Sequence, residues 1–64
     1  MKKIEVDKRL RGCGWWLDRQ GSRHEIWTNG ELTEAVPRHK EIDEHTARSI
    51  LRRAAANPVQ KDKR

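Results

Sequence analysis

Four consecutive residues, Gly-Ser-Arg-His at positions 21–24, are suited to chemistry on a phosphate. His24 supplies an imidazole, and imidazoles as a class can exchange protons near the pH of a cell. Ser22 offers a hydroxyl donor, and Arg23 or Arg38 can hold phosphate oxygens. Gly21 lets a phosphate approach the backbone closely.

This combination of residues suits the cleavage of RNA. RNA carries its own nucleophile, the 2′-hydroxyl, so cleavage needs a base, cations to offset charge on the phosphorane, and protonation of the leaving oxygen. His24 is the candidate base, and His39 or a water molecule is the candidate acid. Neither a metal ion nor a cofactor is required by this chemistry.

The charge of the chain points to the same class of partner. Fifteen Lys and Arg against ten Asp and Glu give 64 residues a net charge of +5, and phosphate backbones reward basic contacts with counterion release. The N-terminus lacks the apolar run of a signal peptide and no stretch has the length of a membrane span, so a cytoplasmic location without membrane binding is expected. The single cysteine, Cys13, has no partner for a disulfide or a metal site.

Helical periodicity occurs at both ends of the chain. Ile4, Val6, Leu10 and Cys13 form an approximate apolar stripe that should end near Gly12 and Gly14. In the second predicted helix Asp43 is the N-cap and Asn57-Pro58 is the stop. Its apolar stripe consists of Ala47, Ile50, Leu51, Ala54 and Ala55. The domain should therefore span residues 1–56, with 57–64 as a basic disordered tail.

Between the helices, strand formers and turn signals predict three strands. The first begins at Trp15 and ends before the turn at 20–22, and the second spans 23–28. Asn29-Gly30 predicts a type I′ hairpin turn into a third strand, 31–36, which Pro37 should end.

The order helix, strand, strand, strand, helix predicts an α+β fold. Its three-stranded antiparallel sheet would carry both helices on one face, as in a double-stranded-RNA-binding domain. Trp15 and Trp16 should point to opposite faces of the sheet. If Ile26 belongs to the core, His24 lies at the sheet's edge rather than on its open face.

Several short elements, in order, resemble the HicA toxin family over about residues 3–55. They are Gly14-Trp15, Gly21-Ser22-Arg23-His24, Val36-Pro37-Arg38-His39, Glu41-Ile42 and Thr46-Ala47-Arg48-Ser49-Ile50-Leu51. The resemblance implies an αβββα toxin that cleaves mRNA with His24 as its catalytic residue and is neutralised by a HicB-type antitoxin. Arg23 stands where many relatives carry His or Asn, and Glu25 adds a carboxylate beside the expected base.

The positions expected to bind RNA extend beyond the histidine. They are Gly21, Ser22, Arg23, Arg38, His39, Arg48 and Arg52. Arg48, Arg52 and Arg53 form a row on the second helix that suits RNA phosphates or an acidic antitoxin segment. An exposed tryptophan would suit a base or the antitoxin equally.

Two alternatives remain open at the level of sequence. The same fold can serve as a non-catalytic module that binds double-stranded RNA. It can also serve as a regulatory subunit whose basic surface meets an acidic protein or DNA.

Overall fold

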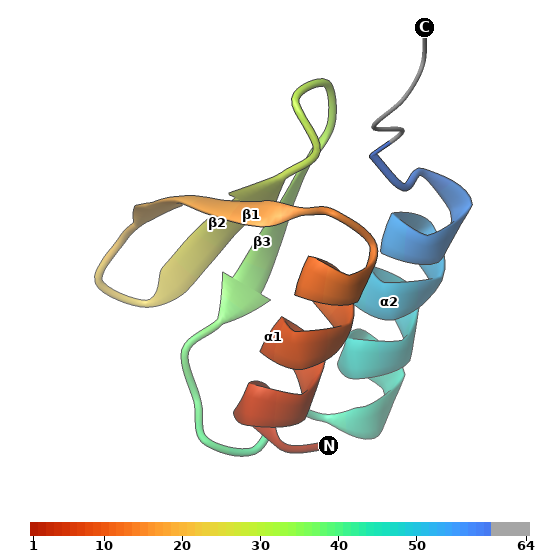
Figure 1. Ribbon diagram of the computed structural model, residues 1–64. Coiled ribbons are helices and arrows are strands. Elements are labelled where there is room, and N and C mark those ends of the chain that lie inside the picture. The colour runs from red at the N-terminus through yellow and green to blue at the C-terminus, as the bar shows by residue number, and fades with distance from the viewer. Residues whose placement is uncertain (60–64) are drawn as a thin grey trace, which may run out of the picture.

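The computed structural model describes residues 1–59, which form two helices and one three-stranded sheet (Figure 1). In chain order the elements are α1 (Lys3–Gly12), β1 (Trp16–Gln20), β2 (His24–Thr28), β3 (Thr33–Pro37) and α2 (Glu44–Ala56). The predicted α+β order is confirmed. Most of the predicted tail, residues 60–64, lies outside the described residues.

The sheet is antiparallel, with strand order β1-β2-β3. Figure 1 shows α1 and α2 side by side on one face of this sheet, which leaves the other face open. This two-layer arrangement is the double-stranded-RNA-binding-domain layout that the sequence predicts.

The core lies between the helices and the sheet. Its buried residues are Val6, Leu10, Trp15, Trp27, Val36, Ile42, Ala47, Ile50 and Ala54. Trp27 and Glu25 alternate with Ile26 along β2 and face the helices, so Ile26 and His24 lie on the open face. Ile26 is not part of the core. The sequence predicts His24 at the sheet's edge only if Ile26 is buried, so that placement does not apply.

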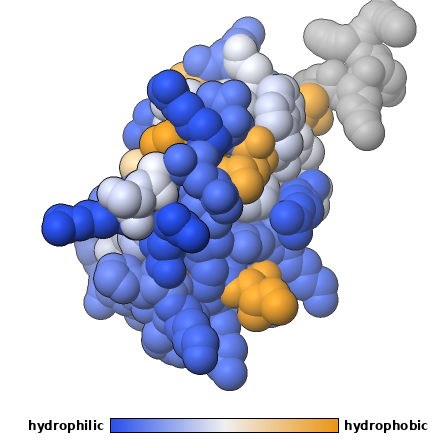
Figure 2. Space-filling model, turned by 90° about the vertical axis from the view of Figure 1, so that its left-hand side faces the viewer, coloured by the Kyte–Doolittle hydropathy of each residue, from blue (hydrophilic) through white to orange (hydrophobic). Residues whose placement is uncertain are grey.

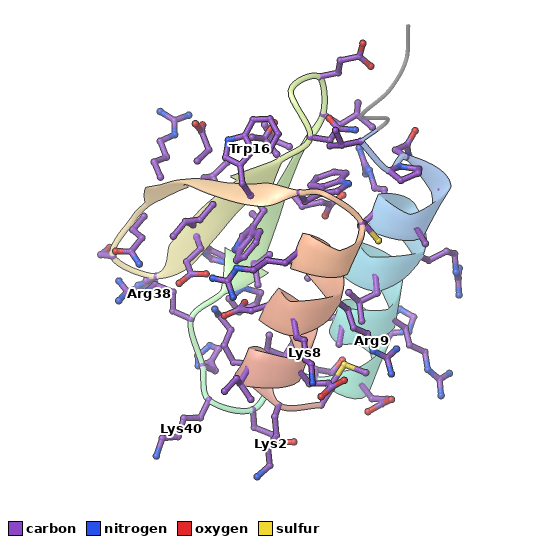
Figure 3. All side chains as sticks on the ribbon, viewed as in Figure 1. Lys2, Lys8, Arg9, Trp16, Arg38 and Lys40 are labelled. Atoms are coloured by element: carbon purple, nitrogen blue, oxygen red, sulfur yellow. The ribbon has the colours of Figure 1, made fainter. Side chains whose placement is uncertain are left out.

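The two adjacent tryptophans separate as predicted. Trp15 is buried, whereas Trp16 is 47% exposed and points away from the helices (Figure 3). Ile4, expected in the buried stripe of the first helix, is instead 74% exposed. Val6 and Leu10 alone bury this helix, because they lie on one side of it about one turn apart while Ile4 lies on another.

The predicted type I′ turn at Asn29-Gly30 is wrong. Thr28 pairs with Thr33, so four residues, 29–32, connect the strands. Gly30 has a φ of 102°, but Asn29 does not adopt a positive φ. The Asn29 side-chain oxygen instead accepts hydrogen bonds from the backbone N–H groups of Glu31 and Leu32, at 2.8 and 2.7 Å. β3 consequently starts two residues later than predicted.

The second helix begins and ends at the predicted signals. The Asp43 carboxylate accepts a 3.1 Å hydrogen bond from the N–H of Thr46, which caps α2. At the other end, the carbonyl of Asn57 accepts hydrogen bonds from the side chains of Trp15 and Asn29. Because Val59 also bonds to the carbonyl of Cys13, the first residues after α2 lie against the rest of the domain.

Candidate functional site

His24 is the first residue of β2 and follows a tight turn. The N–H of Gly21 donates to the carbonyl of His24 at 2.7 Å, which closes this turn. A Cβ on Gly21 would lie 3.2 Å from that carbonyl oxygen, closer than side chains normally approach. A residue without a side chain therefore lets the turn hold His24 at the start of the strand.

Arg38 joins this turn from the end of β3. Its backbone N–H donates to the carbonyl of Arg23 at 3.1 Å, and its guanidinium Nη1 donates to the carbonyl of Gly21 at 2.9 Å. Figure 3 shows the Arg38 side chain beside the turn. Since one guanidinium carries five N–H donors, Arg38 can position the turn and still offer donors to an anion.

Five of the predicted site residues come together around one hollow in the surface. It is lined by Ser22, Arg23, His24, Arg38 and His39. Gly21 contributes to a neighbouring hollow on the open face of the sheet, which shares Ser22, Arg23 and His24 with the first. The His24 side chain is exposed and lies where the two hollows meet.

The second hollow, on the open face of the sheet, adds a cation that the sequence motifs do not predict. Arg19 lines it, together with Ile26. Arg19 pairs with Ile26 because β1 contains an irregularity between Leu17 and Arg19. The alternation of residues along a strand does not predict such a bulge, so the place of Arg19 in the site could be found only from the structure.

Arg48 and Arg52 are not part of this cluster. They lie on α2, which Figure 1 places on the far side of α1 from the turn at 21–23. Arg53, the third member of the predicted row, has its Nε 2.8 Å from Glu34 Oε2 and so links α2 to β3. The three arginines are therefore not one free basic row.

Glu25, which follows His24, does not oppose an anion at the site. It is buried on the helix face, where its Oε1 accepts hydrogen bonds from Lys3 Nζ at 2.8 Å and from Trp27 Nε1 at 3.0 Å. Burial alone would raise the pKa of Glu25, but these hydrogen bonds and the charge of Lys3 outweigh it and lower the pKa. The carboxylate stays ionised and is paired with a cation on the side away from His24.

Lys3 is the centre of this ion-pair network, since its Nζ also contacts both oxygens of Asp7, at 2.8 and 2.9 Å. Burial by itself lowers the pKa of Lys3, but hydrogen bonds and charges from Asp7 and Glu25 raise it overall. The network therefore joins α1 to β2.

The side of the molecule that carries the turn is mainly hydrophilic, with only separate hydrophobic patches (Figure 2). No helix within residues 1–59 is long and apolar enough to cross a membrane. The site thus presents two imidazoles, a hydroxyl and two guanidinium groups on an open polar surface. Such a surface can hold a phosphate and exchange protons with it.

Comparison with known proteins decides the family. A family model described as the HicA toxin of bacterial toxin–antitoxin systems matches residues 5–55. The chain belongs to the HicA toxin family. HicA proteins are toxins of toxin–antitoxin systems and are generally ribonucleases, with RNA as substrate and an antitoxin as partner. No curated protein and no solved structure matches the chain.

Proposed function

We propose that this HicA chain is a cytoplasmic endoribonuclease that cleaves mRNA with His24 as its general base and is neutralised by a HicB-like antitoxin. The observation that carries the proposal is the shared hollow of Ser22, Arg23, His24, Arg38 and His39. It puts an exposed imidazole beside two guanidinium groups and the hydroxyl of Ser22, which suits the cleavage of a phosphodiester.

In the proposed reaction His24 takes the proton of a ribose 2′-hydroxyl. The 2′-oxygen then attacks the adjacent phosphorus while the bond to the 5′-oxygen of the next nucleotide breaks. His39 or a water molecule gives that leaving oxygen a proton. The products are a 2′,3′-cyclic phosphate and a free 5′-hydroxyl, so the atoms and charges balance without an additional reactant.

The other residues of the site and the arginines of α2 have distinct roles in this scheme. Arg23 and Arg38 hold the non-bridging oxygens of the reacting phosphate, where negative charge grows in the transition state. Ser22 donates a hydroxyl hydrogen bond, and Gly21 keeps the backbone accessible. Arg48 and Arg52, on the other side of the domain, would contact distant phosphates of a long RNA or an acidic antitoxin segment.

The exposed surface also offers a place for the antitoxin. Trp16 is a large, half-exposed side chain on the open face of the sheet, the face to which His24 also belongs. An antitoxin that covers this face would cover the base as well, which is inhibition by occlusion.

The test follows the chemistry of the substrate. Purified protein is incubated with an RNA oligonucleotide and with a matched oligonucleotide carrying a single 2′-deoxynucleotide at the cleaved position. We expect cleavage of the first, with a cyclic phosphate end, and no cleavage of the second at that bond. RNA that is bound but stays intact would reject the nuclease and favour the non-catalytic RNA-binding module.

A further inference from the structure

A third hollow, which is also basic, adjoins the site on the side of the N-terminus. Its lining includes Lys2, Ile4, Arg38, His39 and Lys40. Arg38 and His39 also line the hollow around His24, so the two hollows are neighbours. Figure 3 shows Arg38, Lys40 and Lys2 in sequence along one edge of the molecule, from the turn to the start of α1.

Backbone hydrogen bonds fix this arrangement. The N–H of Lys3 donates to the carbonyl of Lys40 at 2.8 Å, the N–H of Ile42 donates to the carbonyl of Met1 at 2.7 Å, and Lys2 forms a bridge with Glu41. These bonds hold the loop after β3 against the start of α1. Because Arg38 bonds to the turn at the other end of the same loop, Lys2 and Lys40 are held in a defined place relative to His24.

The charge of the hollow is available to a ligand. Within the described part of the chain, no carboxylate forms an ion pair with Lys2, Arg38 or Lys40. Two carboxylates also line the hollow, but both have cationic partners. Asp7 pairs with Lys3, and Glu41 Oε2 lies 3.3 Å from the N-terminal ammonium of Met1.

We propose that Lys2, Arg38, His39 and Lys40 form a track that binds the RNA backbone beside the cleaved phosphate. The proposal rests on the ribonuclease function above and adds two residues and a direction: the RNA leaves His24 over Arg38 and runs toward the N-terminus of α1. A row of spaced cations fits a chain of phosphates better than a single small anion. Ile4, 74% exposed in the same hollow, provides apolar contact for a nucleoside.

The test compares two double variants that remove the same charge. Lys2→Ala/Lys40→Ala removes two exposed side chains of the track and keeps the backbone bonds of both residues. Lys8→Ala/Arg9→Ala removes two exposed cations of α1 that do not line the hollow (Figure 3). RNA binding is measured at several salt concentrations in a His24→Ala background, so that the RNA stays intact. Cleavage is measured separately with His24 present.

Each phosphate contact on single-stranded RNA contributes about 0.7 to the slope of log affinity against log salt. Loss of two contacts should lower that slope by about 1.4, and affinity near 0.1 M salt by about 25-fold. The RNA concentration that gives half-maximal cleavage should rise by a similar factor, while the rate at saturating RNA stays unchanged. The Lys8→Ala/Arg9→Ala pair should bind with the slope of its parent.

Equal slopes for the two double variants would overturn the track. Unchanged RNA binding together with weaker antitoxin binding would also overturn it, and would assign the surface to the antitoxin instead. The nuclease proposal fails separately, if the protein with intact His24 cleaves no RNA whatever the slopes are.

Discussion

The guanidinium of Arg38 donates a 2.9 Å hydrogen bond to the carbonyl of Gly21, which links the end of β3 to the turn before His24. Two short motifs that are separated in the sequence, residues 21–24 and 36–39, thereby become one site. The link gives Arg38 a positioning role in addition to its charge.

Arg38→Lys separates these two roles, because it keeps the charge but loses the planar fork of donors. We expect the rate at saturating RNA to fall by about 10- to 100-fold, since a shifted turn misplaces the base. The half-saturating RNA concentration should change little. A change in that concentration alone would mean that Arg38 only binds phosphate.

Gly21→Ala should reduce cleavage because the added Cβ would meet the carbonyl of His24 at 3.2 Å. The turn must shift by a few tenths of an ångström, so we expect a severalfold lower rate with RNA affinity maintained. Gly12→Ala is the matched control, since its Cβ would meet nothing within 4 Å. Equal rates for both variants would remove any special role from Gly21.

Glu25→Gln tests the ion-pair network of Lys3, Asp7 and Glu25. Loss of the charged hydrogen bond from Lys3 should lower the free energy of unfolding by about 1 to 3 kcal/mol at neutral pH. The pKa of Glu25 is lowered in the folded state from 4.5, so its contribution is full above pH 4.5 and is lost as pH falls through the folded pKa. Denaturant titrations of both proteins should therefore converge in acid.

The pKa of Lys3 is raised in the folded state, so the contribution of Lys3 to stability changes with pH in the opposite direction. Its contribution is full below its ordinary pKa of 10.5 and is lost as pH rises through the folded value. For Glu25, the contradicting result is a wild-type free energy of unfolding that is the same at pH 7 as at a pH below the folded pKa of Glu25.

Ile50→Ala should cost about 2 to 5 kcal/mol of stability, because this side chain is 4% exposed within the core. Leu51→Ala is the control. Leu51 follows Ile50 on α2 but is only partly buried against the same core, so its replacement should cost clearly less stability. Thermal or denaturant unfolding measures both. Equal costs would mean that the burial of α2 differs from that described.

Much of the fold follows from local signals that act within a few residues. Asp43 caps a helix because its carboxylate reaches the N–H of Thr46, and Asn57-Pro58 ends it. Asn29-Gly30 misled because the Asn29 side chain satisfies two backbone donors in a four-residue loop. Ile4 misled because an apolar residue in a short helix need not face the core.

Part of the candidate site is likewise recognisable in the sequence, and part is not. Residues 21–24 and 38–39 are recognisable in the sequence because they occur as contiguous motifs with suitable chemistry. Lys2 and Lys40 join them only through the backbone bonds between the N-terminus and the loop after β3, and Arg19 joins only through the bulge in β1. Such pairings depend on the tertiary structure, which spacing along the chain does not encode.

The most direct test of the account is the rate at which purified His24→Ala protein cleaves RNA, with His45→Ala as the matched exposed histidine on α2. Loss of a general base should reduce the rate by about 10²- to 10⁴-fold, while melting temperature and antitoxin binding stay close to wild type. His45→Ala should cleave normally. A folded His24→Ala protein that cleaves RNA at the wild-type rate would contradict the account.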